Sequence, residues 1–142
     1  MKRGDTLMRL KRFRVDELKR RMATLDAMRA DAERKLADLE ESVARERQRA
    51  NDSDIGRLAF PSFLRSIDSR RENLRATLKE LERERLTVQD DLGGAFNELK
   101  SLEFAAEQQQ KRVDEIEARR AQSRLDEMAI VRHLRKHALR GA

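Results

Sequence analysis

The sequence lacks cysteine, tryptophan and tyrosine, and it contains only 1 proline and 5 glycines. Without cysteine the chain can form neither a disulfide framework nor a thiol-based site, which is consistent with a reducing compartment. The start, Met1-Lys2-Arg3, is not followed by an apolar stretch, so we expect no secretory signal. The longest apolar run, Met128-Ala129-Ile130-Val131, is far shorter than the roughly 20 residues of a transmembrane helix.

Large apolar side chains are also scarce. Of the 142 residues, 42% are charged, 38% are apolar and 4% are aromatic. These apolar residues are too few to fill a globular core, so we expect them to form narrow stripes. Disorder is the competing interpretation, because it shares this composition. The net charge is only +6, and the two signs are interleaved, which favours helices with charged faces.

Breakers of regular structure are clustered. Asn51-Asp52-Ser53-Asp54-Ile55-Gly56 is the one clear loop signal. Pro61 follows at a position typical of a first helical turn, Asp5 or Thr6 is a candidate N-cap, and Gly141 is a candidate stop. We therefore predict one all-α coiled-coil domain over 1–142. It has a helix over about 5–50, a loop over about 51–60 and a helix over about 61–138.

Both predicted helices carry a heptad pattern with apolar residues at most a and d positions, which is typical of a coiled coil. In the first helix the seam positions are Met8, Lys11, Val15, Leu18, Met22, Leu25, Arg29, Ala32, Leu36, Leu39, Val43, Glu46 and Ala50. In the second they are Phe60, Leu64, Ile67, Arg71, Leu74, Leu78, Leu81, Arg85, Val88, Leu92, Ala95, Leu99, Leu102, Ala106, Gln109, Val113 and Ile116.

A single register aligns the two helices as an antiparallel hairpin. If the numbers of facing residues sum to about 110, Val43 faces Ile67 and Leu36 faces Leu74. Each seam arginine then faces an apolar residue, along which its aliphatic stem can pack while its charged end reaches water. The expected pairs are Arg71 with Leu39, Arg85 with Leu25, and Arg29 with Leu81.

The second helix is expected to overhang beyond about residue 108, where the first helix no longer covers it. Its apolar residues there require a partner outside the chain. Gly93-Gly94 lies in the same helix, either as a tolerated weak point or as a hinge. The apolar residues of the overhang are Val113, Ile116, Leu125, Met128, Ile130, Val131 and Leu134.

Charge is distributed unevenly along the chain. Basic residues dominate 1–21 and 119–142, whereas 22–118 carries an acidic excess. A hairpin would bring both basic segments to one end, where they would suit a partner with an acidic opening. Nucleic acid is the rival partner, but the basic segments offer only Phe13 for base stacking and contain no recognition motif.

Motifs of catalysis are missing. The sequence contains no P-loop, no GxGxxG, no HExxH and no GxSxG. His133 and His137 share one helix face but have no evident third metal ligand, so we interpret them as solvated histidines. We predict neither an enzyme nor a cofactor. We predict a stalk that docks other proteins. A structural scaffold that self-associates and a basic nucleic-acid binder remain the alternatives.

Four segments resemble the flagellar export stalk proteins of the FliJ family, within the wider group of type III secretion stalk proteins. They are "TLMRLKRFRVDELKRRM", "FPSFLRSIDSRRENLRATL", "FNELKSLE" and "RLDEMAIVR". The last is the most specific, because a hydrophobic–Asp–Glu–hydrophobic step near the C-terminus is typical of the family. The resemblance leaves open whether the system is a flagellum or an injectisome.

The resemblance implies a cytoplasmic part of a type III protein export apparatus, which in the flagellar case takes part in flagellum biogenesis and hence motility. It implies that the terminal end docks into a hexameric export ATPase and promotes its assembly and activity. The hairpin end would reach the cytoplasmic domain of the export-gate membrane protein, and secretion chaperones are further implied partners. The protein would lie at the inner-membrane face, held there only through its partners.

The resemblance also implies two sets of contact residues. Leu125, Asp126, Glu127 and Met128 match the terminal motif, and charge adds Arg9, Arg12, Arg132 and Arg135 to the ATPase-contact set. The implied gate-contact set is Lys35, Leu39, Ser42, Glu46, Phe63, Ile67, Arg70 and Leu74. Ser42 and Glu46 stand where some family members carry aromatics, and Leu39, Ile67 and Leu74 are also seam positions.

Overall fold

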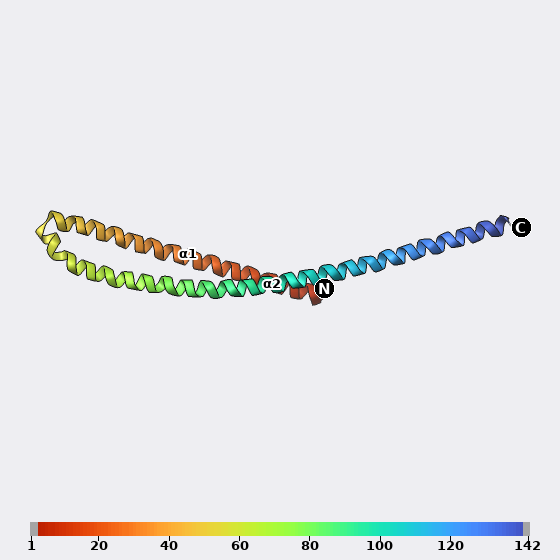
Figure 1. Ribbon diagram of the computed structural model, residues 1–142, viewed down its shortest axis with the longest axis horizontal. Helices are drawn as coiled ribbons and strands as arrows, with labels where there is room; N and C mark the ends of the chain where they lie inside the picture. The colour runs from red at the N-terminus through yellow and green to blue at the C-terminus, as the bar shows by residue number, and fades with distance from the viewer. Residues whose placement is uncertain (1–2, 141–142) are drawn as a thin grey trace. The chain divides into compact units, whose positions relative to one another are not determined.

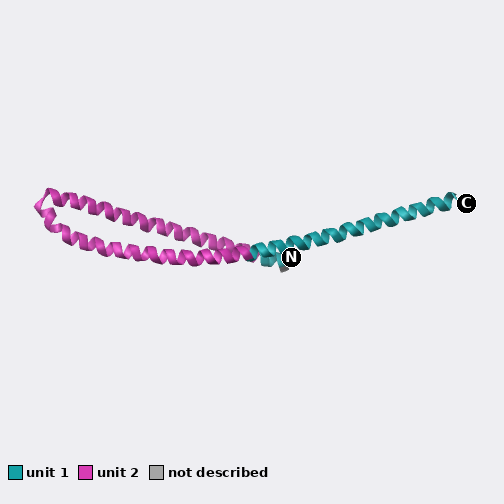
Figure 2. Cartoon of the chain, viewed as in Figure 1, with its two compact units in different colours: residues 1–8, 98–142 teal, residues 9–97 magenta. Residues whose placement is uncertain are grey.

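The computed structural model describes residues 3–140, and within that range the protein is all-α. Helix α1 (Arg3–Asp52) and helix α2 (Asp54–Arg140) are separated only by Ser53 (Figure 1). This confirms the predicted fold class of a helical hairpin. The chain forms two compact units: unit 1 comprises residues 1–8 and 98–142, and unit 2 comprises residues 9–97 (Figure 2). That residues 1–142 form one domain stays a prediction.

Unit 2 is an antiparallel hairpin whose core is the predicted seam. Within residues 9–52 of α1, every predicted seam position except Arg29 is buried or half-buried, and Ser42 is the one additional covered residue. Leu25 is only 1% exposed and Ile67 only 2%. The seam works because a 3.5-residue repeat keeps one stripe of each helix toward the other. The buried side chains of unit 2 are Val15, Leu18, Leu25, Ala32, Val43, Ala50, Ile67 and Leu81.

Ion pairs between the two helices confirm the predicted register. Each seam arginine binds the acidic residue that directly follows its expected apolar neighbour. Arg71 Nε lies 2.7 Å from Glu40 Oε1, and Arg85 Nε lies 3.0 Å from Asp26 Oδ1. Arg29 Nη1 lies 3.8 Å from Glu82 Oε2. The guanidinium groups therefore reach carboxylates at the edge of the seam while their stems cover it.

Arg71 makes the closest of these contacts. Its Nη2 also donates to Glu40 Oε2 at 2.8 Å, and its Nη1 donates to Asp68 Oδ1 at 3.0 Å. The side chain is only 17% exposed. The hydrogen bond to Glu40 is the main reason that the pKa of Arg71 is raised. The pKa of Arg29 is raised chiefly by its hydrogen bond to Glu33. Both arginines therefore stay charged at physiological pH.

The loop predicted over 51–60 is wrong, because the chain leaves one helix and enters the next at Ser53. The Ser53 backbone N–H still donates to Arg49 O at 3.1 Å, which closes the last turn of α1. Its Oγ accepts a hydrogen bond of 3.0 Å from the backbone N–H of Gly56. Ser53 is thus the N-cap of α2, and this cap satisfies a donor that the first helical turn would otherwise leave unpaired.

Gly56 is required by close packing at this turn. A Cβ at position 56 would lie 2.6 Å from the backbone oxygen of Arg49 and 2.9 Å from Ser53 Oγ. Such distances are well below van der Waals contact, and the obstacle is backbone that cannot rotate away. The absence of a side chain therefore lets α2 begin directly against the end of α1.

Other predicted boundaries need correction. Pro61 lies inside α2 and not in its first turn, because the Ser53 cap starts the helix earlier. Neither Asp5 nor Thr6 is an N-cap, since α1 is already helical at Arg3; Asp5 lies in the first turn, where a negative charge favours the helix dipole. Gly141 lies outside the described residues. Helix α2 runs uninterrupted through Gly93-Gly94, so the hinge stays a prediction.

In unit 1, α2 changes from covered to exposed along its length. Leu99 is buried and Leu102 is half-buried, but every residue from 114 to 140 is exposed. At 1.5 Å per residue this stretch is about 40 Å of exposed helix. Its apolar side chains are therefore open to a partner, as expected for the overhang. No helix within residues 3–140 combines the length and apolarity needed to cross a membrane.

Candidate docking surfaces

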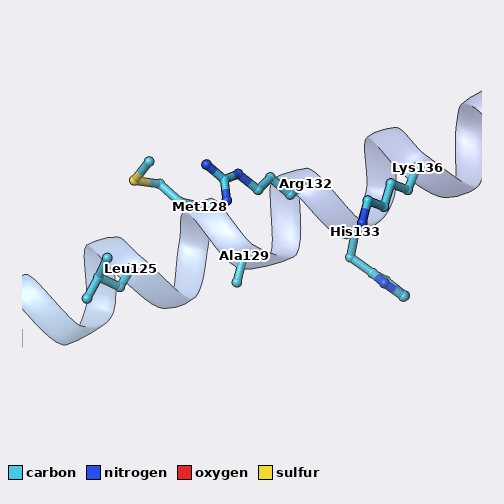
Figure 3. A pocket seen from close by; sticks show the side chains of 6 residues that line it. All are labelled: Leu125, Met128, Ala129, Arg132, His133 and Lys136. Atoms are coloured by element: carbon cyan, nitrogen blue, oxygen red, sulfur yellow. The ribbon is translucent and has the colours of Figure 1, made fainter.

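The first candidate is a shallow hollow on the exposed part of α2, which we call the terminal surface. Each of its residues lies three or four positions from another member, so the side chains are neighbours on the helix surface. All come from α2, as Figure 3 shows. The terminal surface consists of Leu125, Met128, Ala129, Arg132, His133 and Lys136.

This surface combines apolar side chains with positive charge. Leu125 is 60% exposed and Met128 is 57% exposed, although both are apolar. A neighbouring hollow shares Met128 and Arg132 and adds Arg124, Glu127, Val131 and Arg135. An apolar strip flanked by arginines suits a partner that offers apolar contacts and carboxylates.

The terminal surface and its neighbouring hollow bring together five of the eight predicted ATPase-contact residues: Leu125, Glu127, Met128, Arg132 and Arg135. Asp126 lines neither, and its carboxylate accepts a hydrogen bond of 3.1 Å from Gln122 within the helix. Arg9 and Arg12 are exposed on α1 in unit 2. Neither arginine lines the terminal surface or its neighbouring hollow.

The second candidate lies between the two helices of unit 2, and we call it the hairpin groove. It is lined by Lys35, Asp38 and Leu39 from α1 and by Arg70, Asn73 and Leu74 from α2. Leu39 and Leu74 are half-buried, so each contributes to the seam and still presents apolar surface. Four of the predicted gate-contact residues thus meet in one place: Lys35, Leu39, Arg70 and Leu74.

The other predicted gate-contact residues lie outside the groove. Ile67 is buried in the seam, so in this structure it serves the core. Phe63 is half-buried near the turn. Ser42 Oγ accepts a hydrogen bond from Arg45 at 3.2 Å, and Glu46 accepts one from Arg49 at 2.9 Å. These last two contacts tie both polar side chains to their own helix.

Sequence reasoning missed several residues of both surfaces. Asp38 and Asn73 line the hairpin groove, and their positions one residue before Leu39 and Leu74 would have indicated this once the register was known. Ala129, His133 and Lys136 were missed on the terminal surface, although they lie three to four residues from predicted members. Helical spacing was the available signal in each case.

The rings of His133 and His137 lie close together, with centroids 4.3 Å apart. Within residues 3–140 they have no third companion, since no group of three or more His, Cys, Asp or Glu side chains is arranged to hold a metal ion. Arg132 and Lys136 flank His133 on the same surface, and their charge opposes a bound cation. His133 therefore adds a polar ring to the terminal surface.

Comparison with known proteins gives one match. A family model described as "Flagellar FliJ protein" matches residues 1–138, which is nearly the whole chain. The comparisons with curated proteins and with solved structures find no significant match. The family match favours the flagellar alternative over the injectisome.

Proposed function

Because the chain belongs to the flagellar FliJ protein family, we propose that it is a stalk that docks into the flagellar export ATPase and couples it to the export gate. Family membership makes it a component of flagellar protein export and not a member of an enzyme family. The finer proposal concerns which surfaces engage which partners. Scaffold and nucleic-acid binder become the less favoured alternatives.

The observation that carries the proposal is the exposed stretch of α2 from 114 to 140. A helix with this many apolar side chains in water is favoured only if a partner covers them, since each buried side chain contributes about 1.5–3 kcal/mol. Its arginines favour a partner with acidic groups at the same place. We assign this partner to the hexameric ATPase, which the terminal surface enters and whose assembly and activity it promotes.

The hairpin groove supports the second half of the proposal. Its apolar floor, Leu39 and Leu74, is flanked by the exposed cations Lys35 and Arg70. This arrangement suits a side chain of the export-gate cytoplasmic domain that is apolar and has acidic neighbours. Secretion chaperones are retained as partners from family membership, without an assigned surface. We place the protein at the inner-membrane face, held through these partners.

A binding experiment tests the ATPase contact. The double variant Leu125→Asp/Met128→Asp should lose co-elution with the purified export ATPase, because it puts two charges into the apolar strip. Ile55→Asp/Leu58→Asp is the matched control, since both residues are 82% exposed on α2 but lie outside the terminal surface. Retained binding by the first variant, or equal loss in the control, contradicts the assignment.

A second experiment tests the gate contact. Lys35→Glu/Arg70→Glu reverses both cations of the hairpin groove and should weaken binding to the gate cytoplasmic domain at least about tenfold. Arg34→Glu/Arg83→Glu makes the same change in charge at two exposed arginines whose ion pairs are local to one helix. If both double variants bind as tightly as the unaltered chain, the groove is not the contact.

A further inference from the structure

The three seam arginines of unit 2 share one arrangement, although they come from both helices. Each guanidinium binds the acid that follows the apolar residue it faces: Arg71 with Glu40, Arg85 with Asp26, and Arg29 with Glu82. We infer that these arginines hold the hairpin in one register and prevent its two helices from sliding past each other by a heptad. The inference does not depend on the identity of any partner.

The apolar seam alone does not select this register. Apolar residues recur every seven positions on both helices, so a slip of one heptad still brings apolar residues face to face. Leu36, for example, faces Leu74 in the observed register. It would face Ile67 after a slip in one direction and Leu81 after a slip in the other, and all three are apolar seam residues.

A slip that brings Leu36 opposite Ile67 is opposed by charge. Arg85 would leave Asp26 and come beside Lys19, and Arg29 would leave Glu82 and come beside Arg75. Only Arg71 would find another acid, Glu33. Two attractive contacts would thus become repulsive, one of them at Arg85, whose side chain is only 32% exposed.

The opposite slip, which brings Leu36 opposite Leu81, is opposed less strongly. Arg85 would meet Glu33, but Arg29 would meet the uncharged Gln89. Arg71 would exchange its hydrogen bond to Glu40 for a place between Glu46 and Arg47. Of the three registers, only the observed one gives every seam arginine an acidic neighbour without also placing a cation beside it.

In the proposed stalk, the seam-arginine contacts affect how a displacement at one end of unit 2 reaches the other end. In a coiled coil with a uniform apolar seam, one helix can slide by a heptad relative to its partner if the helix ends beside the turn unwind or extend. Here sliding breaks the interhelical contacts of all three seam arginines, and in either direction only one of them finds a new acid without an added cation. A displacement imposed near Ser53 therefore arrives at the far end of unit 2 as a movement of both helices together.

Pairs of introduced cysteines test the inference directly, because the chain has no cysteine of its own. Leu36→Cys combined with Leu74→Cys reports the observed register, whereas Leu36→Cys with Ile67→Cys or with Leu81→Cys reports the two slips. A disulfide forms only when the Cα atoms come within about 7 Å. With the arginines intact, only the first pair should cross-link readily.

The decisive background is Arg29→Leu/Arg71→Leu/Arg85→Leu. In it, cross-linking of at least one slipped pair should rise at least about tenfold while circular dichroism still shows a helical hairpin. The control background, Arg34→Leu/Arg45→Leu/Arg83→Leu, removes the same charge from arginines whose hydrogen bonds or ion pairs stay within one helix, and should leave slipped cross-linking low.

A charge exchange separates register from stability. Arg71→Glu with Glu40→Arg restores an ion pair between the same positions, so its slipped cross-linking should return toward that of the unaltered chain, whereas Arg71→Glu alone should raise it. Exclusive cross-linking of the Leu36–Leu74 reporter pair in the triple-leucine background overturns the inference. So does an equal rise of slipped products in the control background.

Discussion

Replacing Gly56 by alanine should destabilise the hairpin, although alanine is the better helix former. Intrinsic propensity alone favours the change by about 1 kcal/mol, because Gly56 lies within α2. The added Cβ, however, would stand 2.6 Å from the backbone oxygen of Arg49. To reach ordinary contact at 3.4 Å, the end of α1 and the start of α2 must separate by about 0.8 Å, since neither group can rotate away.

That separation weakens the two hydrogen bonds that define the turn. One joins the Ser53 N–H to Arg49 O, and the other joins the Gly56 N–H to Ser53 Oγ. Each contributes about 1 kcal/mol, of which the separation removes about half, and the residual strain of a crowded site adds about 1–3 kcal/mol. After the gain in propensity is subtracted, Gly56→Ala should lower the free energy of unfolding by about 1–3 kcal/mol.

Urea unfolding followed by circular dichroism at 222 nm measures this quantity. Gly93→Ala is the matched control, because a Cβ there would meet nothing within 4 Å. It should therefore raise the free energy of unfolding by up to about 1 kcal/mol. Opposite signs for the two variants are expected; an increase in stability for Gly56→Ala would refute the steric argument for the turn.

Three further predictions concern the cap, the seam and the glycine pair. Ser53→Ala removes the acceptor for the Gly56 N–H and should lower the free energy of unfolding by about 1 kcal/mol, whereas Ser53→Asp should retain most of it. Leu25→Ala should lower the free energy of unfolding by about 2–5 kcal/mol because Leu25 is 1% exposed, whereas Leu58→Ala should change it little because Leu58 is 82% exposed. Urea unfolding measures the free energy of unfolding for the cap and seam variants. Gly93→Ala/Gly94→Ala should increase the helicity measured by circular dichroism. If the glycine pair is a hinge, swimming motility should fall although the free energy of unfolding does not.

The seam and its register were predictable because they rest on a repeat that dominates the sequence. The heptad pattern placed Leu25 and Ile67 in the core, and both are buried. The seam arginines were expected opposite Leu39, Leu25 and Leu81, and their ion pairs to Glu40, Asp26 and Glu82 confirm it. Strong periodicity leaves few alternatives for two helices that must cover each other.

The turn was not predictable by the same reasoning. Asn, Asp, Ser and Gly in succession are typical of a loop, and Pro61 is typical of a helix start. Yet Ser53 caps α2 at once, and Gly56 permits an approach that any other residue would prevent. Such a turn depends on contacts between backbone atoms of two helices, which composition does not reveal.

The docking surfaces were predictable in part. The resemblance to the family grouped Leu125 with Met128 and Leu39 with Leu74, and the members of each pair line one hollow. Ile67 illustrates the limit, because a seam position that is also a proposed contact is buried when the partner is absent. Exposure is a property of the folded pair of helices, so the sequence alone left its role open.

The most direct test of the stalk proposal is the rate of ATP hydrolysis by the flagellar export ATPase of the same organism, titrated with this protein at moderate salt. A saturable stimulation is expected, and it should be lost in Leu125→Asp/Met128→Asp and kept in Ile55→Asp/Leu58→Asp. If the unaltered protein produces no stimulation, or if the terminal variant stimulates fully, the terminal surface of α2 does not act on the ATPase.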